Sequence, residues 1–337
     1  MVNDYGEGLR TYLAGNRRLD RWIDFKSYQV FDEAITYTSL QFYRRQPADG
    51  VRCVLAPRGE VQISSIEWNE GIEAIPYDEL PAGETWSLLP EAERRLKQRL
   101  TASFPRLDDA AHTKHIFQGL IPSPNWIYHL QRIGPRRYRQ FPEEGEPREV
   151  EIEDAIMHPL VSGVEAKRYQ VPRTETYILF PYNLAGATPR LFTQQEMNQR
   201  FPLAWGYLCE YEAVLRGRER NSFDDDRWYQ FARNQNLDKQ HTPKLGVAET
   251  APELRVFYDE QGEFYFDNVR VNGIVAADEQ SPWYLLACMN SRVVNFVFKL
   301  SAKPKQNQYF EANKQFIAPL PISDQRPAPV LWRQTGS

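Results

Sequence analysis

The N-terminal part of the chain has a clear pattern of apolar and polar positions. Residues 9–13 place apolar side chains at the spacing of one helix face, and residues 19–26 form an apolar run typical of a strand. Residues 36–43 alternate β-branched or aromatic side chains with polar ones, which again indicates a strand. Residues 6–45 are therefore predicted to form a helix, a strand, a turn and a strand. Because an isolated hairpin is only marginally stable in water, this one is expected to pack on another part of the protein.

A longer amphipathic helix is predicted after a stretch of mixed strand and loop character at residues 51–80. Pro90 stands where a first helical residue would, and Leu96, Leu100 and Phe104 follow on one face. The basic residues of this helix are Arg94, Arg95, Lys97 and Arg99. They could contact phosphate, but such a face is more often simply solvated. Residues 135–151 are rich in Pro, Gly, Arg and Glu and are predicted to form an exposed loop.

The C-terminal half is patterned as helices with strands between them. Residues 193–196 have the sequence of a capping box that opens a helix, and an apolar stripe follows from residue 203 to residue 215. Residues 255–267 are predicted to form a hairpin around a Gln-Gly turn. Residues 281–300 are predicted to form one apolar helix, with Ser as its cap and Pro at its first position. Helices and strands do not alternate regularly, so the predicted fold class is α+β.

Several short segments occur in an order that is similar to a known family. They are Ile116–Asn125, His158–Tyr169, Ile178–Tyr182, Trp228–Asn234 and Tyr284–Ser291. In this order they resemble the C-terminal specificity domain of TaqI-type adenine-N6 DNA methyltransferases and of the restriction enzymes fused to them. Residues 8–38 resemble the closing strands of the Rossmann-like domain of these methyltransferases. The resemblance extends from about Gly8 to Ile322.

The resemblance implies a mixed-sheet target-recognition domain preceded by the closing β-hairpin of a Rossmann-like methyltransferase domain. Residues 1–50 would be the C-terminal remnant of the methyltransferase catalytic domain, and residues 51–110 a connector with the amphipathic helix. Residues 111–325 would be the DNA target-recognition (specificity) domain, and residues 326–337 a tail.

The motifs that methyl transfer requires are absent from the sequence. Adenine-N6 transfer needs a glycine-rich strand-to-helix turn for S-adenosylmethionine and a polar-Pro-Pro-aromatic loop at the flipped base. Residues 123–126 and 281–283 resemble that loop but lack its second proline, which favours a turn and a helix start instead. The histidines have no ligand-like neighbours, so no metal site is expected. No cofactor is expected in this chain, S-adenosylmethionine being bound by the parent enzyme, and the chain alone is expected to be inactive.

The composition limits the class of protein and the kinds of site that the chain can contain. The 337 residues are 42% hydrophobic, which is ample for a core, and the net charge of −4 argues mildly against a protein that coats nucleic acid. Acidic residues gather at 143–153 and 224–226. The three cysteines are widely spaced and fit neither a disulfide framework nor a zinc knuckle. No apolar run is long enough for a membrane span, and a cytoplasmic location is expected.

Polar and basic residues that are suited to DNA contact fall into groups along the chain. The first group is Gln118, Ser123 and Asn125, at a turn where Gly119 permits close backbone approach. The second group is Lys167, Arg168 and Tyr169, which follow only a partial match to the family's Gly-x-Asp-Ile pattern. The alternatives are an ordinary turn between strands for the first group and a solvated strand entrance for the second.

The third group is the largest and the fourth lies near the C-terminus. The third comprises Arg216, Arg218, Arg220, Arg227, Arg233, Asn234, Lys239 and Lys244. Residues 224–226, all aspartate, could instead pair with these arginines on a solvated face, and Trp228 is more typical of a core residue than of a base-stacking ring. The fourth group contains Lys303 and Lys305.

These observations predict sequence-specific recognition of double-stranded DNA. The chain would be the specificity part of an adenine-specific N6 DNA methyltransferase in a restriction–modification or phage-defence system. Its partner would be a methyltransferase catalytic domain or subunit, in a longer parent protein or as a separate chain. One alternative is a protein-interaction subunit of a methyltransferase complex, which a large apolar surface patch near residues 19–43 without a basic cleft would favour. Another is a complete enzyme of unrecognised type.

Overall fold

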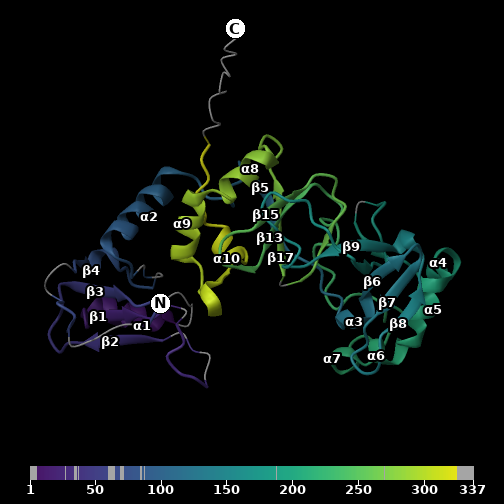
Figure 1. The fold of residues 1–337 in the computed structure, drawn as a ribbon, viewed down its shortest axis with the longest axis horizontal. Helices are drawn as coiled ribbons and strands as arrows, with labels where there is room; N and C mark the ends of the chain where they lie inside the picture. Colours follow the sequence, from purple (N-terminus) through teal and green to yellow (C-terminus); the bar gives the residue numbers. More distant parts are fainter. Residues whose placement is uncertain are drawn as a thin grey trace, which may run out of the picture.

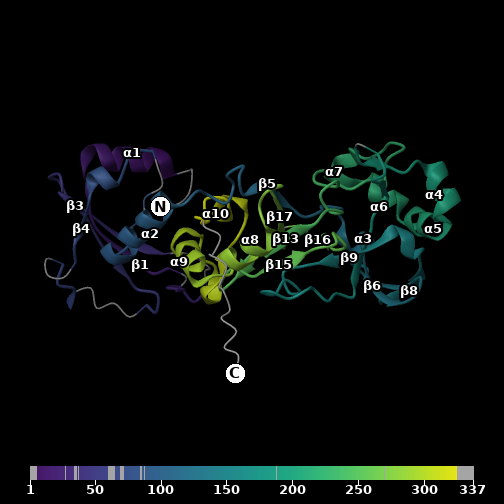
Figure 2. The same ribbon diagram turned by 90° about the horizontal axis from the view of Figure 1, so that it is seen from above.

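The protein is elongated, with successive units along its longest axis (Figure 1). The computed structural model describes residues 6–26, 28–33, 36, 38–59, 65–68, 72–83, 86, 88–186, 188–268 and 270–324. We call residues 6–103 the N-terminal lobe, residues 105–118 with 244–259 and 270–324 the central lobe, and residues 120–240 with 265–266 the distal lobe. The same order along the axis is seen from above (Figure 2).

The N-terminal lobe is built on a four-stranded sheet with the order β2-β1-β3-β4. Its strands are β1 (Leu19–Asp24), β2 (Ser39–Tyr43), β3 (Gly50–Leu55) and β4 (Ala74–Pro76). β1 pairs antiparallel with β2 and parallel with β3. The predicted strand pair is therefore present, and its apolar face is covered by α1 (Glu7–Asn16), which adds Leu13 to the core, and by residues after the short helix η3 (Tyr77–Glu79). The sheet crosses the predicted boundary at residue 50. Tyr37, in the middle of the predicted second strand, lies outside the described residues.

Helix α2 (Glu91–Ser103) links the N-terminal lobe to the central lobe, with Pro90 as its N-cap. The sequence predicted that Arg94 lies on an exposed basic face of this helix, and this is wrong because the residue is only 4% exposed. Its Nε lies 2.8 Å from Glu79 Oε2, so the charge is paired inside the lobe. Arg95 pairs with Glu91 one helical turn away. The helix therefore uses one arginine for packing, because a long cationic stem can cover apolar surface when its head finds a carboxylate.

The central lobe contains a second four-stranded sheet, with the order β15-β13-β17-β5. Its strands are β5 (Thr113–Gln118), β13 (Lys244–Ala248), β15 (Val256–Asp259) and β17 (Val271–Ala276). The helices α8 (Pro282–Met289), α9 (Arg292–Ser301) and α10 (Lys314–Ile317) cover it. A small pair, β14 (Thr250–Ala251) and β18 (Phe310–Glu311), lies beside it, with the short helix η5 (Gln306–Gln308) between α9 and β18.

The single helix predicted for residues 281–300 is two helices. Asn290 ends α8, and its side chain accepts a hydrogen bond from Val256 N (3.1 Å) and donates one to Val256 O (2.9 Å). Ser291 then caps α9 by accepting from Val294 N. The break arises because Asn290 is tied to the neighbouring strand β15, a contact that helical periodicity does not reveal.

The distal lobe contains a six-stranded sheet with the order β16-β9-β10-β6-β7-β8. Its strands are β6 (His129–Gly134), β7 (Arg137–Gln140), β8 (Arg148–Glu151), β9 (Met157–Val161), β10 (Thr176–Leu179) and β16 (Tyr265–Phe266). The predicted exposed loop at 135–151 is wrong for β7 and β8, which form a regular antiparallel ladder. Tyr138 of β7 is fully buried and donates to Asp154 Oδ1, which explains why a polar, charged stretch belongs to the sheet.

Short helices complete the distal lobe. They are α3 (Asn125–Tyr128), η4 (Asp154–Ile156), α4 (Gln194–Arg200), α5 (Pro202–Glu210), α6 (Glu212–Arg216) and α7 (Arg218–Asn221), with a small strand pair β11 (Tyr182–Asn183) and β12 (Arg190–Leu191). The predicted capping box is confirmed: Thr193 Oγ1 accepts from Glu196 N, and the Glu196 carboxylate accepts from Thr193 N. Trp228 is buried in the core, as predicted.

The predicted hairpin at residues 255–267 is not formed. β15 pairs with β13 in the central sheet, whereas β16 pairs parallel with β9 of the distal lobe. The Asp259 carboxylate accepts hydrogen bonds from Glu263 N and Phe264 N, which organises the turn that carries the chain from one sheet to the other.

At the junction of the central and distal lobes, backbones approach closely. A Cβ at Gly119 would lie 2.3 Å from Phe266 O and 2.6 Å from Asp267 O, so only glycine fits. The close approach predicted for Gly119 is therefore to the chain's own backbone. Beside it, Asp267 is largely buried, its Oδ1 has no hydrogen-bond partner in the described part of the chain, and burial raises the pKa of this carboxyl to about 6.

The fold class α+β is confirmed by these mixed sheets. None of the helices in the described ranges has the length and apolar character needed to cross a lipid bilayer.

Candidate nucleic-acid interface

The first and third predicted groups of DNA-contact residues lie together. Ala232 N donates to Pro122 O (3.0 Å) and Arg233 N donates to Ile121 O (3.2 Å), so the two loops run side by side. Asn236 Nδ2 donates to Gln118 O at 3.1 Å. Their exposed side chains form one surface of the distal lobe, which we call the loop surface: Ser123, Asn125, Arg220, Arg227, Arg233 and Asn234, with half-buried Lys239 and Gln118 beside them.

The second and fourth groups lie elsewhere. Tyr169 N donates to Val256 O of the central lobe, and Arg168 pairs with Glu253 at 2.6 Å and donates to Asn290 O. Lys167 and Tyr169 are exposed. Lys303 lines a cleft of about 820 Å³ between the N-terminal lobe and the end of α9, and Lys305 pairs with Glu311 at 3.0 Å. The predicted residues therefore do not form one continuous interface.

Lys244 cannot contact DNA, and its prediction was wrong. The side chain is 1% exposed, and Nζ donates to Asp259 Oδ2 (2.7 Å), Gln240 O (2.7 Å) and Thr242 O (3.3 Å). An ammonium group has three donors, and all of them are used here. The sequence pattern placed Lys244 among the DNA contacts, but its charge is compensated inside the central lobe by Asp259.

Arg218, predicted as a DNA contact, has a structural role within the distal lobe. Its guanidinium donates to the carbonyl oxygens of Leu215, Pro122, Ser123, Trp228 and Gln230 at 2.5–3.1 Å. The same group lies 4.2 Å from the centroid of the Phe223 ring. It thus holds the first loop, the end of α6 and the chain around Trp228 to one another, which shapes the loop surface.

Replacing Arg218 by lysine is expected to lower the free energy of unfolding by about 1–2 kcal/mol, because one ammonium cannot reach carbonyls that a guanidinium fork holds together. Urea denaturation measures the loss. Arg220→Lys is the matched control, since Arg220 is exposed and has no hydrogen-bond or acidic partner among the described residues. Equal stability of the two variants would contradict the role assigned to Arg218.

Acidic neighbours pair with most of the other arginines of the third group. Arg216 pairs with Glu212 (2.8 Å) and Asp224 (3.1 Å), Arg227 with Asp225 (3.2 Å), and Arg233 with Glu219 (2.6 Å). This is the pairing that the sequence left open as an alternative for residues 224–226. Exposed ion pairs are worth only about 0–1 kcal/mol, so a phosphate can replace the carboxylate at little cost. Arg216 is the exception, because it also donates to Asp225 O and stacks over the buried Trp228.

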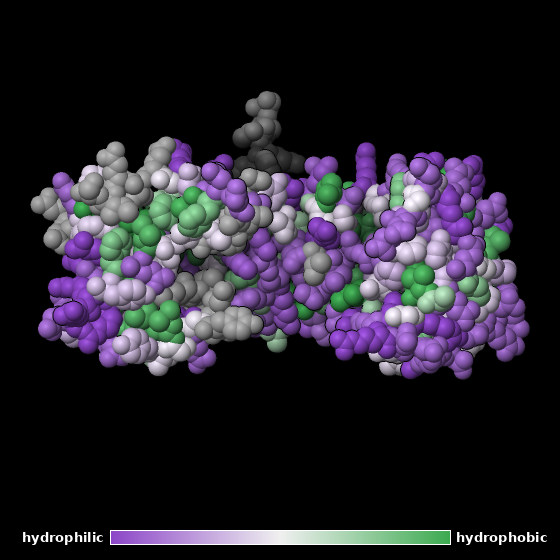
Figure 3. Space-filling model, turned by 90° about the horizontal axis from the view of Figure 1, so that it is seen from below, coloured by the Kyte–Doolittle hydropathy of each residue, from purple (hydrophilic) through white to green (hydrophobic). Residues whose placement is uncertain are grey.

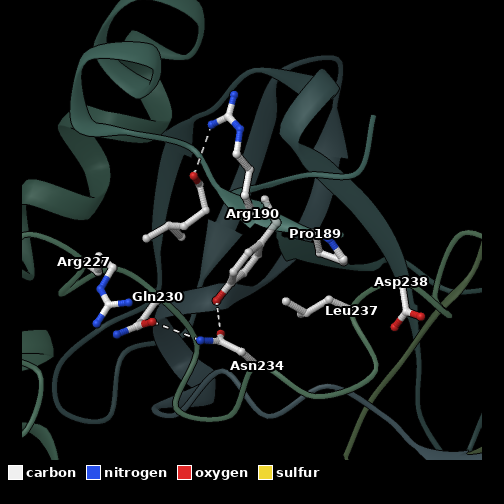
Figure 4. A pocket seen from close by; sticks show the side chains of 9 residues that line it. Pro189, Arg190, Arg227, Gln230, Asn234, Leu237 and Asp238 are labelled. Carbon is white, nitrogen blue, oxygen red and sulfur yellow. Dashed lines mark hydrogen bonds between the residues drawn. The ribbon is translucent and has the colours of Figure 1, made fainter. Parts of the chain in front are cut away.

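A recess of about 450 Å³ opens on the loop surface, and we call it the Tyr182 recess (Figure 4). Its lining residues are Tyr182, Pro189, Arg190, Leu191, Arg227, Gln230, Asn234, Leu237 and Asp238. Figure 4 shows Arg227, Gln230 and Asn234 toward one side and Asp238 toward the other, with Leu237 between them. The side chains that reach it are therefore amides, guanidinium groups and a carboxylate around a small apolar wall.

Tyr182 anchors the polar side of this recess. The ring is 6% exposed, and its hydroxyl accepts from Phe231 N (2.6 Å) and donates to Asn234 Oδ1 (2.6 Å). Asn234 Nδ2 in turn donates to Gln230 Oε1 at 3.0 Å. Burial raises the pKa of Tyr182 well above its ordinary value, so the hydroxyl keeps its proton at any physiological pH. This chain of hydrogen bonds, which begins at the buried tyrosine, fixes the orientations of the Asn234 and Gln230 side-chain amides.

Sequence reasoning missed Gln230, Asp238 and Arg190, which line the recess beside the predicted Arg227 and Asn234. Gln230 had a usable signal, since it lies within the Trp228–Asn234 segment and glutamine is a base-reading side chain. Asp238 and Arg190 had none, because the recess joins segments that are far apart in sequence. In the described residues, no group of three His, Cys, Asp or Glu is placed to hold a metal ion.

A known family model matches the segment that runs from β9 to the residues after α10. Residues 158–322 match the model of the TaqI-like C-terminal specificity domain. The resemblance predicted from the sequence is thereby confirmed for this segment. The matched segment includes the second, third and fourth groups of predicted residues and all the residues that line the Tyr182 recess.

Sequence similarity to two curated proteins extends over more of the chain than this segment. The chain is 22% identical over 253 residues to the type II restriction enzyme and methyltransferase RM.Eco57I of Escherichia coli, covering 70% of this chain and 24% of that protein. It is 20% identical over 280 residues to the type II methyltransferase M.BstVI of Geobacillus stearothermophilus, covering 78% of this chain and 46% of that protein. The chain thus spans less than half the length of either relative.

Solved structures give weaker likenesses. The type IIG restriction endonuclease BpuSI is similar with a TM-score of 0.42 and 12% identity, covering 96% of this chain and 38% of that chain. The type IIL restriction–modification enzyme MmeI, solved in complex with DNA, is similar with a TM-score of 0.46 and 11% identity, covering 89% of this chain and 34% of that chain.

Proposed function

We propose that this chain is the target-recognition part of an adenine-specific N6 DNA methyltransferase in a restriction–modification system. The match of residues 158–322 to the TaqI-like specificity domain is the observation that carries the proposal. The names of the relatives, a type II restriction enzyme and type II methyltransferases, support it. In this proposal the loop surface grips duplex DNA through phosphate contacts, and amide and guanidinium groups read base edges.

The chemistry of methyl transfer would come from a catalytic domain or subunit. In this proposal the partner binds S-adenosylmethionine, and within the described N-terminal sheet no strand runs into a glycine-rich turn followed directly by a helix. The chain's own contribution is to bind the duplex and orient one adenine toward the partner. A role in phage defence is part of the same proposal.

The N-terminal lobe has features suited to contact with that catalytic partner. Tyr28, Val30, Phe31 and Tyr43 are exposed, and Phe31 has 54% of its surface accessible. The cleft beside α9 adds apolar lining residues such as Leu9, Trp22 and Phe310. Figure 3 shows apolar side chains gathered over the N-terminal end, whereas the distal end is largely hydrophilic. This observation favours the second candidate function, a protein-interaction subunit, which differs from the first in needing no DNA binding.

The proposal is tested by selecting sequences from a randomised duplex pool with the purified chain at low salt. Enrichment of a defined sequence is the expected result, with affinity that falls steeply as salt rises, because phosphate contacts release counterions. A chain that enriches no sequence but forms a stoichiometric complex with a catalytic subunit would replace the first candidate function by the second.

The double substitution Arg227→Ala and Arg233→Ala is expected to weaken binding to all duplexes and to reduce the slope of log affinity against log salt by about 2, roughly 0.9 for each lost phosphate contact. The matched control is Arg44→Ala with Arg106→Ala, two exposed arginines that also form ion pairs but lie outside the distal lobe. An equal reduction in the control, or none in the loop-surface variant, would contradict the assignment of these arginines to DNA.

A further inference from the structure

The Tyr182 recess offers hydrogen-bond donors and an acceptor in a particular order. We propose that it reads one G·C base pair from the major groove, an inference that rests on the proposed recognition of DNA. The amides of Gln230 and Asn234 would meet guanine, and the Asp238 carboxylate would meet cytosine.

The donor side follows from the hydrogen bonds already formed. Phe231 N donates to Tyr182 Oη, so the hydroxyl proton is directed to Asn234 Oδ1. Asn234 Nδ2 then donates to Gln230 Oε1. Each amide oxygen therefore accepts a bond within the protein. The groups presented outward are both hydrogens of Gln230 Nε2, which has no acceptor in the described part of the chain, and the second hydrogen of Asn234 Nδ2.

These donors are held in place before any ligand arrives. Gln230 N donates to Arg227 O (2.8 Å), and Gln230 O accepts from Arg218 Nη2 (2.9 Å). The same arginine binds Trp228 O, so the backbone on which Gln230 stands is tied to the core. Such preorganisation reduces the side-chain entropy lost on binding, which favours selective contact.

The acceptor side is the Asp238 carboxylate. Figure 4 places Asp238 across the recess from Gln230 and Arg227. Its side chain is exposed, and its only ion pair in the described ranges is with the adjacent Lys239, at 3.2 Å. An ionised carboxylate accepts hydrogen bonds and donates none.

The order donor, donor, acceptor matches only one kind of base pair. In the major groove guanine presents two acceptors, N7 and O6, and its cytosine partner presents the N4 amine as a donor. An A·T pair would bring the adenine N6 amine against the amide donors and thymine O4 against the carboxylate. Both contacts are repulsive, so the recess discriminates by mismatch as well as by bonding.

The test compares base preferences of the full chain and its variants after selection from a randomised duplex pool at low salt. The informative variants are Gln230→Glu, which converts donors to acceptors, and Asp238→Asn, which adds a donor on the opposite side. The matched controls are Gln261→Glu and Glu260→Gln, exposed neighbours in the turn between β15 and β16. Thermal melting confirms that each variant folds.

The expected result is a G·C pair at one position, with its preference over A·T reduced about tenfold or more in both informative variants and unchanged in both controls. Replacing that guanine by 7-deazaguanine, which lacks the N7 acceptor, should weaken binding of the wild-type chain but not of Gln230→Glu. Enrichment whose base preferences neither variant alters would overturn the inference and leave the proposed function standing. No enrichment by the wild-type chain would overturn the proposed function itself.

Discussion

Replacing Lys244 by methionine is expected to lower the free energy of unfolding by about 3–5 kcal/mol, because it leaves a buried carboxylate without its counterion. The pair it breaks is almost completely enclosed, with side-chain exposures of 0% for Lys244 and 2% for Asp259. Burial lowers the pKa of Lys244, while the charge of Asp259 works in the opposite direction. The lysine also binds Gln240 O and Thr242 O, which join the distal lobe to β13.

Denaturant titration followed by tryptophan fluorescence measures this loss. The matched control is Lys239→Met, in which the broken pair with Asp238 is only partly buried and the expected change is below about 1 kcal/mol. The double variant Lys244→Met with Asp259→Asn should be less destabilised than the sum of its single changes, since the unpaired charge is removed. A Lys244→Met protein within 1 kcal/mol of wild type, on the scale of surface substitutions, would show that the pair is not a structural link.

Replacing Asp267 by asparagine is expected to raise the free energy of unfolding at pH 7 by about 2 kcal/mol. Burial raises the pKa of this carboxyl to about 6, whereas an unfolded aspartate titrates near pH 4. Because the folded-state pKa is the higher one, the contribution of Asp267 to stability is fully present below about pH 4 and is lost as the pH rises through about 6. At pH 7 the folded state carries an ionised, buried carboxylate whose Oδ1 has no hydrogen-bond partner among the described residues.

Urea midpoints at pH 4 and pH 7 test this assignment. The wild-type protein should lose more stability than Asp267→Asn between these two values, and the variants should converge at the acidic end. Glu260→Gln serves as the control, since Glu260 is exposed and should leave the pH dependence unchanged. Parallel pH profiles of wild type and Asp267→Asn would contradict the raised pKa as the source of the effect.

Local patterns predicted several elements well, because they depend on residues close in sequence. The capping box at Thr193 and Glu196 and the paired strands β1 and β2 follow from spacing alone. The elements that were missed depend on distant partners. Tyr138 draws a polar segment into the sheet by binding Asp154, and Asn290 interrupts a helix by binding Val256. Neither partner is visible in a window of neighbouring residues.

For the candidate site, the sequence likewise predicted the contributing segments but not the role of each side chain. Composition identified the segments around Ser123 and Arg227, and the structure brings them together through backbone contacts such as that of Ala232 with Pro122. Charge alone could not separate Lys244 and Arg218, which the fold uses internally, from Arg220, which is exposed. Distinguishing them requires knowledge of which carbonyls and carboxylates each cation meets.

The parallel pairing of β16 with β9 has a consequence for exchanging the distal lobe between related proteins. Tyr265 and Phe266 come after the rest of the distal lobe in sequence, yet they form the outermost strand of its sheet. A transplant of residues 119–240 alone would therefore deprive the donated module of an edge strand and leave the recipient's own residues in its place. A chimaera that folds should therefore take residues 119–240 and residues 265–266 from the same parent. Otherwise the edge strand and its neighbour β9 would come from different proteins and pack poorly.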